Sequence, residues 1–258
     1  MGIRQLVSFF TLQMLFFALI ANADSGSTSL KVSDTNFLNK LRTTTVVEDR
    51  LDLLRVLEKK PSESTRLTLE IIALDTKEDE SVRMQAICSL GDSATKESVP
   101  ILLDILETDL IQRRGFWACV IPLLSNLNDR RVIPLLTRIA NLNKDHLAGM
   151  DHMAIEALAE IGDEREVCLL NSKAYIVPVR LSIIKGLARI GSIQSVDILI
   201  GALQEEDEPE IIKTAEAGLL KLNEVAIPAL NKALQEIAEG WNESYRSRIK
   251  SIIIQIQQ

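Results

Sequence analysis

Two histidines, His146 and His152, are the side chains best suited to acid–base or metal chemistry in this chain of 258 residues. His152 lies four residues before Glu156, so the two would share one face of a helix. An imidazole and a carboxylate on one face can bind a divalent cation, which makes this pair the candidate metal site. The alternative, which we favour, is a solvated loop leading into a helix N-terminus, where acidic residues are electrostatically favourable.

The three cysteines are candidate nucleophiles, but their surroundings favour a structural role. Cys88, Cys119 and Cys168 each lie among apolar residues of expected helices, so we expect each to be a buried, small hydrophobic side chain. Their odd number leaves at least one thiol unpaired. The sequence contains no Gly-rich phosphate loop, nucleophile elbow or pair of carboxylates at a catalytic spacing. It therefore predicts no catalytic residue and no cofactor.

A cluster of basic residues in the middle of the chain is the candidate binding surface. The chain is acidic, with a net charge of −7, so a local basic patch would stand out. Such a patch would attract an acidic segment of a protein partner, or an anionic lipid or glycan, with adjacent aromatic residues as anchors. The alternative is that these arginines are ordinary surface residues paired with acids of neighbouring repeats. The candidate patch consists of Arg113, Arg114, Phe116, Trp117, Arg130, Arg131 and Arg138.

The composition indicates which elements would carry these residues. Hydrophobic residues make up 47% of the chain but aromatic residues only 4%, and the chain has 11 Gly and 7 Pro. So few Gly and Pro disfavour a sheet with many tight turns, and the aliphatic excess favours packed helices. The acidic balance and the scarcity of aromatic rings also disfavour nucleic-acid binding.

The first 23 residues are typical of a secretory signal peptide. Arg4 precedes an apolar run over residues 6–20, which ends before the small-residue cleavage pattern Ala21-Asn22-Ala23. The run is shorter than the roughly 20 residues needed to span a bilayer, although an uncleaved anchor helix is the alternative. Cleavage would remove the single charge of Arg4, change the net charge from −7 to −8, and leave no stable membrane span. We expect an exported protein, periplasmic or extracellular, with residues 24–43 as a flexible lead-in and residues 44–258 as the folded domain.

A short apolar run recurs along the folded part of the chain. Pro occupies its second position in three of five copies, which fits the first turn of a helix. The intervals between copies are 34, 34, 29 and 31 residues, and a period near 30 is typical of a repeat protein. The five copies begin at Val99, Ile133, Val167, Val196 and Ile227.

A second set of helical segments precedes four of these runs. They start near Val82, Met150, Val179 and Ile211, and each has Leu eight residues after its start. Gly162, Gly191 and Asn223 follow three of them, where a left-handed C-cap is expected. Each unit is therefore predicted to be helix, tight turn, helix, and polar loops such as residues 204–208 join the units.

These spacings resemble HEAT repeats, specifically the short HEAT-like repeats of phycobilin lyases. The resemblance rests on the Val-Arg-x-x-Ala-x-x-x-Leu pattern of residues 82–90, and on residues 157–163 and 179–191. It extends over residues 44–240 and implies an all-α fold, an armadillo-like α-solenoid of about six helical hairpins in a right-handed superhelix. Residues 47–58 and 62–74 would form a degenerate first unit, and residues 241–256 a closing helix.

The resemblance implies a binding scaffold, since most proteins of this kind bind others and a minority are enzymes. HEAT-like hydroxylases carry a di-iron centre on repeated His-Glu dipeptides, and this sequence has no His-Glu dipeptide. We therefore predict a non-catalytic scaffold that binds a protein partner along the concave face formed by the second helices. The alternative is a bilin-lyase-like enzyme or a chromophore- or metal-handling protein. Self-association through the Ile-rich C-terminal helix is a further alternative.

Overall fold

The computed structural model describes residues 40–41, 43–142, 149–237 and 242–258. Helices, with short 3-10 turns between them, form all the regular secondary structure of these residues, so the predicted all-α class is confirmed. The chain divides after Ser93 into two compact units. The predicted signal peptide, residues 1–23, and nearly all of the lead-in lie outside the described residues. The predicted handedness of a superhelix and the number of repeats stay predictions.

Over residues 47–93, the first unit contains three α-helices, and two of them have nearly the bounds expected from the sequence. They are α3 (Val47–Glu58), α4 (Glu63–Leu74) and α5 (Glu80–Ser89), followed by the 3-10 turn η1 (Gly91–Ser93). Ser62 caps α4, because its hydroxyl accepts a hydrogen bond of 3.0 Å from the backbone N–H of Thr65. The helix α5 packs against both α3 and α4 and contributes the fully buried Val82, Ala86 and Ile87.

Five helices of the second unit begin at the first residue of the five repeated apolar runs, as predicted. Pro100, Pro134 and Pro228 occupy their first turns, where a helix needs no backbone N–H. We call these five the second helices. They are α6 (Val99–Gln112), α8 (Ile133–Ala140), α10 (Val167–Lys173), α12 (Val196–Ala202) and α14 (Ile227–Glu236).

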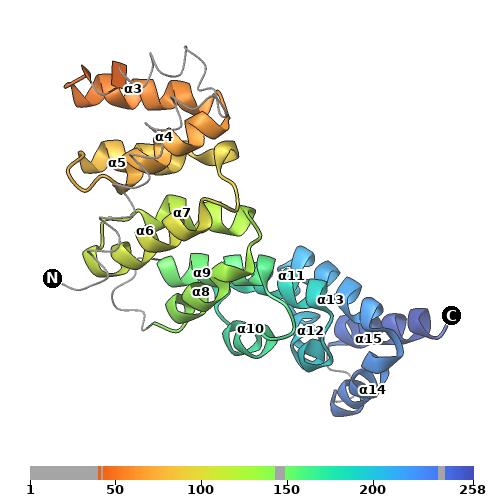
Figure 1. Ribbon diagram of the computed structural model, residues 1–258. Coiled ribbons are helices and arrows are strands. Elements are labelled where there is room, and N and C mark those ends of the chain that lie inside the picture. Colours follow the sequence, from red (N-terminus) through yellow and green to blue (C-terminus); the bar gives the residue numbers. More distant parts are fainter. Residues whose placement is uncertain (1–39, 42, 143–148, 238–241) are drawn as a thin grey trace. The chain divides into compact units, whose positions relative to one another are not determined.

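The remaining helices of the second unit alternate with these and pack against one another in chain order. Contacts join α7 to α9, α9 to α11 and α11 to α13, and Figure 1 shows α9, α11 and α13 following one another on one side. The predicted closing helix is α15, which packs on α13 and α14. We call the first four of these the first helices. The elements are α7 (Trp117–Asn126), α9 (Met150–Ile161), α11 (Arg180–Ile190), α13 (Pro209–Leu222) and α15 (Glu243–Ile256).

Glycine allows the first helices to approach one another closely. A Cβ atom at Gly186 of α11 would lie 2.5 Å from the carbonyl oxygen of Ala159, and one at Gly218 of α13 would lie 2.8 Å from the Cβ of Ala188. Real side chains do not approach so closely, so only glycine fits at these two crossings. The contact recurs between successive repeats, α9 with α11 and α11 with α13.

A basic side chain also links α11 to the end of α9, and another links α13 to the end of α11. Arg189 of α11 donates hydrogen bonds to the carbonyl oxygens of Ala159 and Gly162 at the end of α9. Lys221 of α13 donates to the carbonyl oxygen of Arg189 at the end of α11. The last carbonyl groups of a helix lack partners within it and carry partial negative charge, so cations stabilise them.

The left-handed C-caps were predicted correctly in part. Gly191, at the end of α11, has φ 70° and ψ 42° and is left-handed, as expected. Asn223, at the end of α13, has φ 54° but ψ −141°, which lies outside the left-handed helical region, so this prediction is wrong. The prediction for Gly162 is wrong, because this residue has φ −66° and ψ 164° and is extended. Glycine is needed there for space: a Cβ atom would lie 2.5 Å from the carbonyl oxygen of Leu158.

Candidate functional site

Asp109, at the end of α6, organises the first part of the predicted basic patch. The carboxylate accepts hydrogen bonds from the backbone N–H groups of Arg114, at 2.7 Å, and Trp117, at 2.9 Å. Asp109 is only 1% exposed, so these bonds are shielded from water. Arg113 takes the left-handed conformation that ends α6 and is exposed, whereas Phe116 is 4% exposed and buried.

The second part of the patch consists of arginines that are paired with acids. Arg130 forms an ion pair with Asp163, at 2.5 Å, which lies in the loop before α10. Arg131 pairs with Asp129 at 2.7 Å and also donates to the carbonyl oxygen of Lys96. Arg138 lies 3.5 Å from Glu107. These acids offset much of the positive charge that the sequence places here, as the alternative interpretation of the patch requires.

The ion pairs change the acid–base properties of two carboxyl groups. Hydrogen bonds from Arg131 lower the pKa of Asp129 to about 2. Hydrogen bonds from Arg130 and Arg165 also hold the pKa of Asp163 well below its usual range. Both groups therefore stay ionised and paired down to strongly acidic pH.

The candidate metal pair lies on α9, but its two side chains have separate neighbours. The Nε2 atom of His152 is 3.9 Å from Asp151, and Glu156 accepts a hydrogen bond from the hydroxyl of Ser182 at 3.4 Å. Among residues 40–41, 43–142, 149–237 and 242–258, no group of three or more His, Cys, Asp or Glu side chains is arranged to hold a metal ion. His146 lies outside the described residues, and the favoured interpretation of this region as a solvated loop before a helix stays a prediction.

The cysteines differ from the expectation of three buried side chains. Cys168 is exposed at the start of α10 and is a free thiol. Cys88 and Cys119 are half-buried, and neither is a free thiol. The apolar neighbours Val167 and Leu170 face the core. Cys168 lies on the opposite, solvent-exposed side of this short helix, so its apolar neighbours in sequence did not indicate burial.

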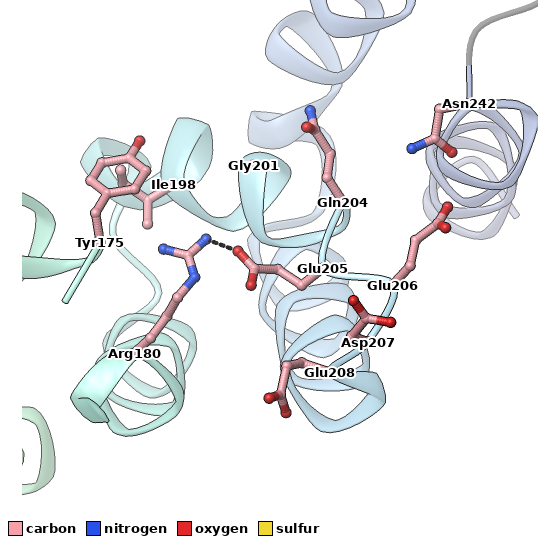
Figure 2. A pocket seen from close by; sticks show the side chains of 10 residues that line it. All are labelled: Tyr175, Arg180, Ile198, Gly201, Gln204, Glu205, Glu206, Asp207, Glu208 and Asn242. Atoms are coloured by element: carbon pink, nitrogen blue, oxygen red, sulfur yellow. Dashed lines mark ion pairs between the residues drawn. The ribbon is translucent and has the colours of Figure 1, made fainter. Parts of the chain in front are cut away.

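A groove of about 760 Å³ in the second unit was not expected from the sequence. Its walls come from three places: the turn after α10 with the start of α11, the helix α12 with the loop before α13, and the start of α15 (Figure 2). Arg248 of α15 donates a 2.9 Å hydrogen bond to the carbonyl oxygen of Leu203, which fixes α15 beside the end of α12. The lining residues are Tyr175, Arg180, Ile198, Gly201, Gln204, Glu205, Glu206, Asp207, Glu208 and Asn242.

Arg180 is the fixed centre of one wall of the groove. The residue is 8% exposed, its guanidinium donates to the carbonyl oxygen of Ala174, and it forms an ion pair with Glu205 (Figure 2). The guanidinium carbon lies 5.4 Å from the centre of the Tyr175 ring, and this ring is 73% exposed. The Nε atom of Arg180 has no hydrogen-bond partner among the described residues.

The comparisons with known proteins identify the repeated units. Residues 82–108 and 179–205 match the family model described as the PBS lyase HEAT-like repeat. The chain contains HEAT-like repeats of the PBS lyase type. One matched segment begins within α5 and continues into α6, and the other begins just before α11 and continues into α12. The recurring Val-Arg, Ala and Leu positions thus predicted the repeat correctly.

Two further comparisons add no functional argument. A solved structure of human deoxyhypusine hydroxylase in complex with glycerol is 12% identical, and the aligned region covers 87% of this chain and 96% of that chain. Its TM-score of 0.37 is too low to carry an inference about this protein. Among curated proteins, no sequence gives a significant match to the chain.

The HEAT-like repeats explain why sequence reasoning missed the groove. Residues 204–208 were interpreted as a polar loop that joins two repeats, which is correct for the backbone. The repeat before them places Tyr175 and Arg180 opposite this loop, about 25 to 30 residues earlier in the chain. The sequence signal that could have indicated the groove was the run of four acidic residues at positions 205–208, since a connecting loop does not need so many charges of one sign.

Proposed function

We propose that this protein is a HEAT-like repeat scaffold that binds another macromolecule. The groove beside α12 carries the proposal, because it is a concave surface on a second helix bordered by an exposed aromatic ring. Exposed Tyr side chains are typical anchors of protein interfaces. Repeated hairpins supply a rigid frame that holds such a surface in place.

The test is recovery of a partner by the purified mature chain, residues 24–258, after chemical cross-linking in an extract of the source cells. Cross-linked peptides identified by mass spectrometry should place the partner on the second unit. A scaffold should retain one partner in stoichiometric amount. Recovery of no macromolecule above the level of a bead control would contradict the proposal.

The candidate patch from Arg113 to Arg138 is a second surface for the same function. If this patch binds the partner, charge reversal at Arg130 and Arg131 should weaken that binding. Reversal at Lys213 and Lys250, which are exposed on α13 and α15, changes the net charge by the same amount and serves as the control. Unchanged partner binding by the Arg130 and Arg131 variant would exclude the patch.

Export of the mature chain is part of this proposal. Its basis is the signal-peptide pattern of residues 1–23. Neither Cys88 nor Cys119 is a free thiol, and this state fits an oxidising compartment. None of the described helices is long and apolar enough to cross a membrane. Expression of the full chain, fractionation and N-terminal sequencing should give an exported product that starts at Asp24. A cytoplasmic product that retains Met1 would contradict export.

A bilin-lyase-like enzyme or a chromophore- or metal-handling protein is the second candidate, favoured by the name of the matched family model. A visible absorbance spectrum and metal analysis of the purified protein separate the two. A tightly bound pigment or a stoichiometric metal would favour this candidate over the scaffold.

A further inference from the structure

We propose that the groove beside α12 binds an extended, lysine- or arginine-rich segment of the partner protein. This inference rests on the proposed scaffold function and adds the chemistry of the segment that is bound.

The charge of the groove is negative. Of its four acidic residues, Glu205 is neutralised by Arg180. Glu206, Asp207 and Glu208 are exposed, and no ion pair is found for them within the described residues. In Figure 2 the Glu206 side chain extends toward Asn242, whereas the Glu208 side chain points away from it, on the other side of the loop before α13. A surface with three uncompensated carboxylates attracts a cation and repels an anion.

The exposed ring selects among cations. Tyr175 lies across the groove from the acidic loop, on the far side of Arg180 (Figure 2). A lysine or arginine side chain can pack its aliphatic stem against such a ring while its charged end reaches the carboxylates. A single metal ion would not use the ring. The described carboxylates also do not converge as a metal-binding group.

Arg180 holds this wall of the groove in place. Its guanidinium donates to the carbonyl oxygen of Ala174, forms an ion pair with Glu205 and lies 5.4 Å from the centre of the Tyr175 ring. Because Arg180 is only 8% exposed, it positions the ring and the start of the acidic loop before a segment binds.

The experiment uses a defined peptide and two matched variants of the mature chain. The probe is a fluorescein-labelled heptapeptide of alternating lysine and serine, and its counterpart has glutamate in place of lysine. Binding is measured by fluorescence anisotropy at about 50 mM salt, where surface charges are weakly screened. The groove variant is E206Q/D207N/E208Q. The control variant is E48Q/E58Q/E224Q, which loses the same charge at exposed acids elsewhere.

The groove variant should bind the lysine peptide about tenfold more weakly than the wild-type protein, and the control variant within about twofold. Y175A should also weaken binding of the lysine peptide. The glutamate peptide should not bind to any of these proteins. Circular dichroism should show the same helix content in all of them. Equal loss in the groove and control variants would overturn the proposal, because the attraction would then be a property of the whole acidic surface. Unchanged binding by the groove variant would also overturn it.

Two further measurements separate this inference from its neighbours. Calcium binding by the wild-type protein that is lost in E206Q/D207N/E208Q would show a cation site and overturn the peptide assignment. If the cross-linked partner binds E206Q/D207N/E208Q as tightly as the wild-type protein, the groove assignment fails while the scaffold function stands. If the wild-type protein retains no partner at all, the scaffold function itself fails.

Discussion

The basic patch and the acidic groove differ in what surrounds their charges. In the patch, Arg130, Arg131 and Arg138 each lie beside an acid. In the groove, only Glu205 has a basic partner, and the three acids after it project into solvent. A chain with 36 acidic and 29 basic residues has enough acids to pair with its arginines, and acids remain in excess. A cluster of like charges in sequence therefore indicates an interaction surface only where the fold leaves those charges uncompensated.

The first prediction concerns the turn that carries Arg113 and Trp117. D109A should destabilise the protein by about 2–4 kcal/mol, because it leaves the part-buried backbone N–H groups of Arg114 and Trp117 without their acceptor. D104A on the same helix removes an exposed carboxylate and is the control. Urea denaturation should therefore show a large decrease in the free energy of unfolding for D109A but not for D104A. Equal stability of the two variants would mean that Asp109 does not hold this turn.

The second prediction concerns the close contact between α9 and α11. G186A should destabilise the protein by about 1–3 kcal/mol, since the new Cβ would lie 2.5 Å from the carbonyl oxygen of Ala159. G201A on α12 meets no atom within 4 Å and should be neutral or stabilising by up to about 1 kcal/mol. Thermal denaturation separates the two outcomes. A stabilised G186A would show that the helices do not pack so closely.

The third prediction compares one ion pair from each region. E205Q should destabilise the protein by about 1–3 kcal/mol, because it leaves the guanidinium of Arg180 buried without its counter-charge. D163N breaks the exposed pair with Arg130 and should have a smaller effect, since water solvates both groups. The free energy of unfolding, measured for both variants at pH 7, checks this order. The reverse order would contradict the assigned burial of Arg180.

The smallest effect concerns pH. The pKa of Asp129 is lower in the folded protein, at about 2, than the value near ~3.9 of an unfolded chain. Its ion pair with Arg131 therefore stabilises the fold fully above about pH 4, and this stabilisation is lost as the pH falls toward 2. D129N should show a smaller fall in melting temperature between pH 5 and pH 2.5 than the wild-type protein. Identical pH profiles would contradict the low pKa.

The helices and their starts were predictable because their signals are local. The apolar runs at Val99 and Ile133 and the Pro that follows each of them specify a helix start within a few residues. The conformation of Gly162 was not predictable, because it depends on the space left by Leu158 and Glu166.

The candidate site was harder to predict than the fold, because its properties depend on contacts across repeats. The partner of Arg130 is Asp163, which lies 33 residues away, and the groove combines Tyr175 with acids about 30 residues later. Sequence reasoning found the residues of the basic patch but not their counter-charges. It treated the acids of the groove as a linker for the same reason.

The hydrogen bonds of Arg189 and Lys221 make the stabilisation of helix ends in the second unit directional: a later helix stabilises the end of an earlier one. Lys221 secures the end of α11, and Arg189 within α11 secures the end of α9, so each helix end depends on the repeat that follows it. Loss of a C-terminal repeat would expose the carbonyl end of the helix before it, and fraying would then pass backward along the chain toward α9. Loss of a repeat on the N-terminal side would leave a lysine or arginine without its acceptor but no helix end uncovered. Because α15 packs on α13 and α14, its loss would be the first step of such unravelling within the described residues.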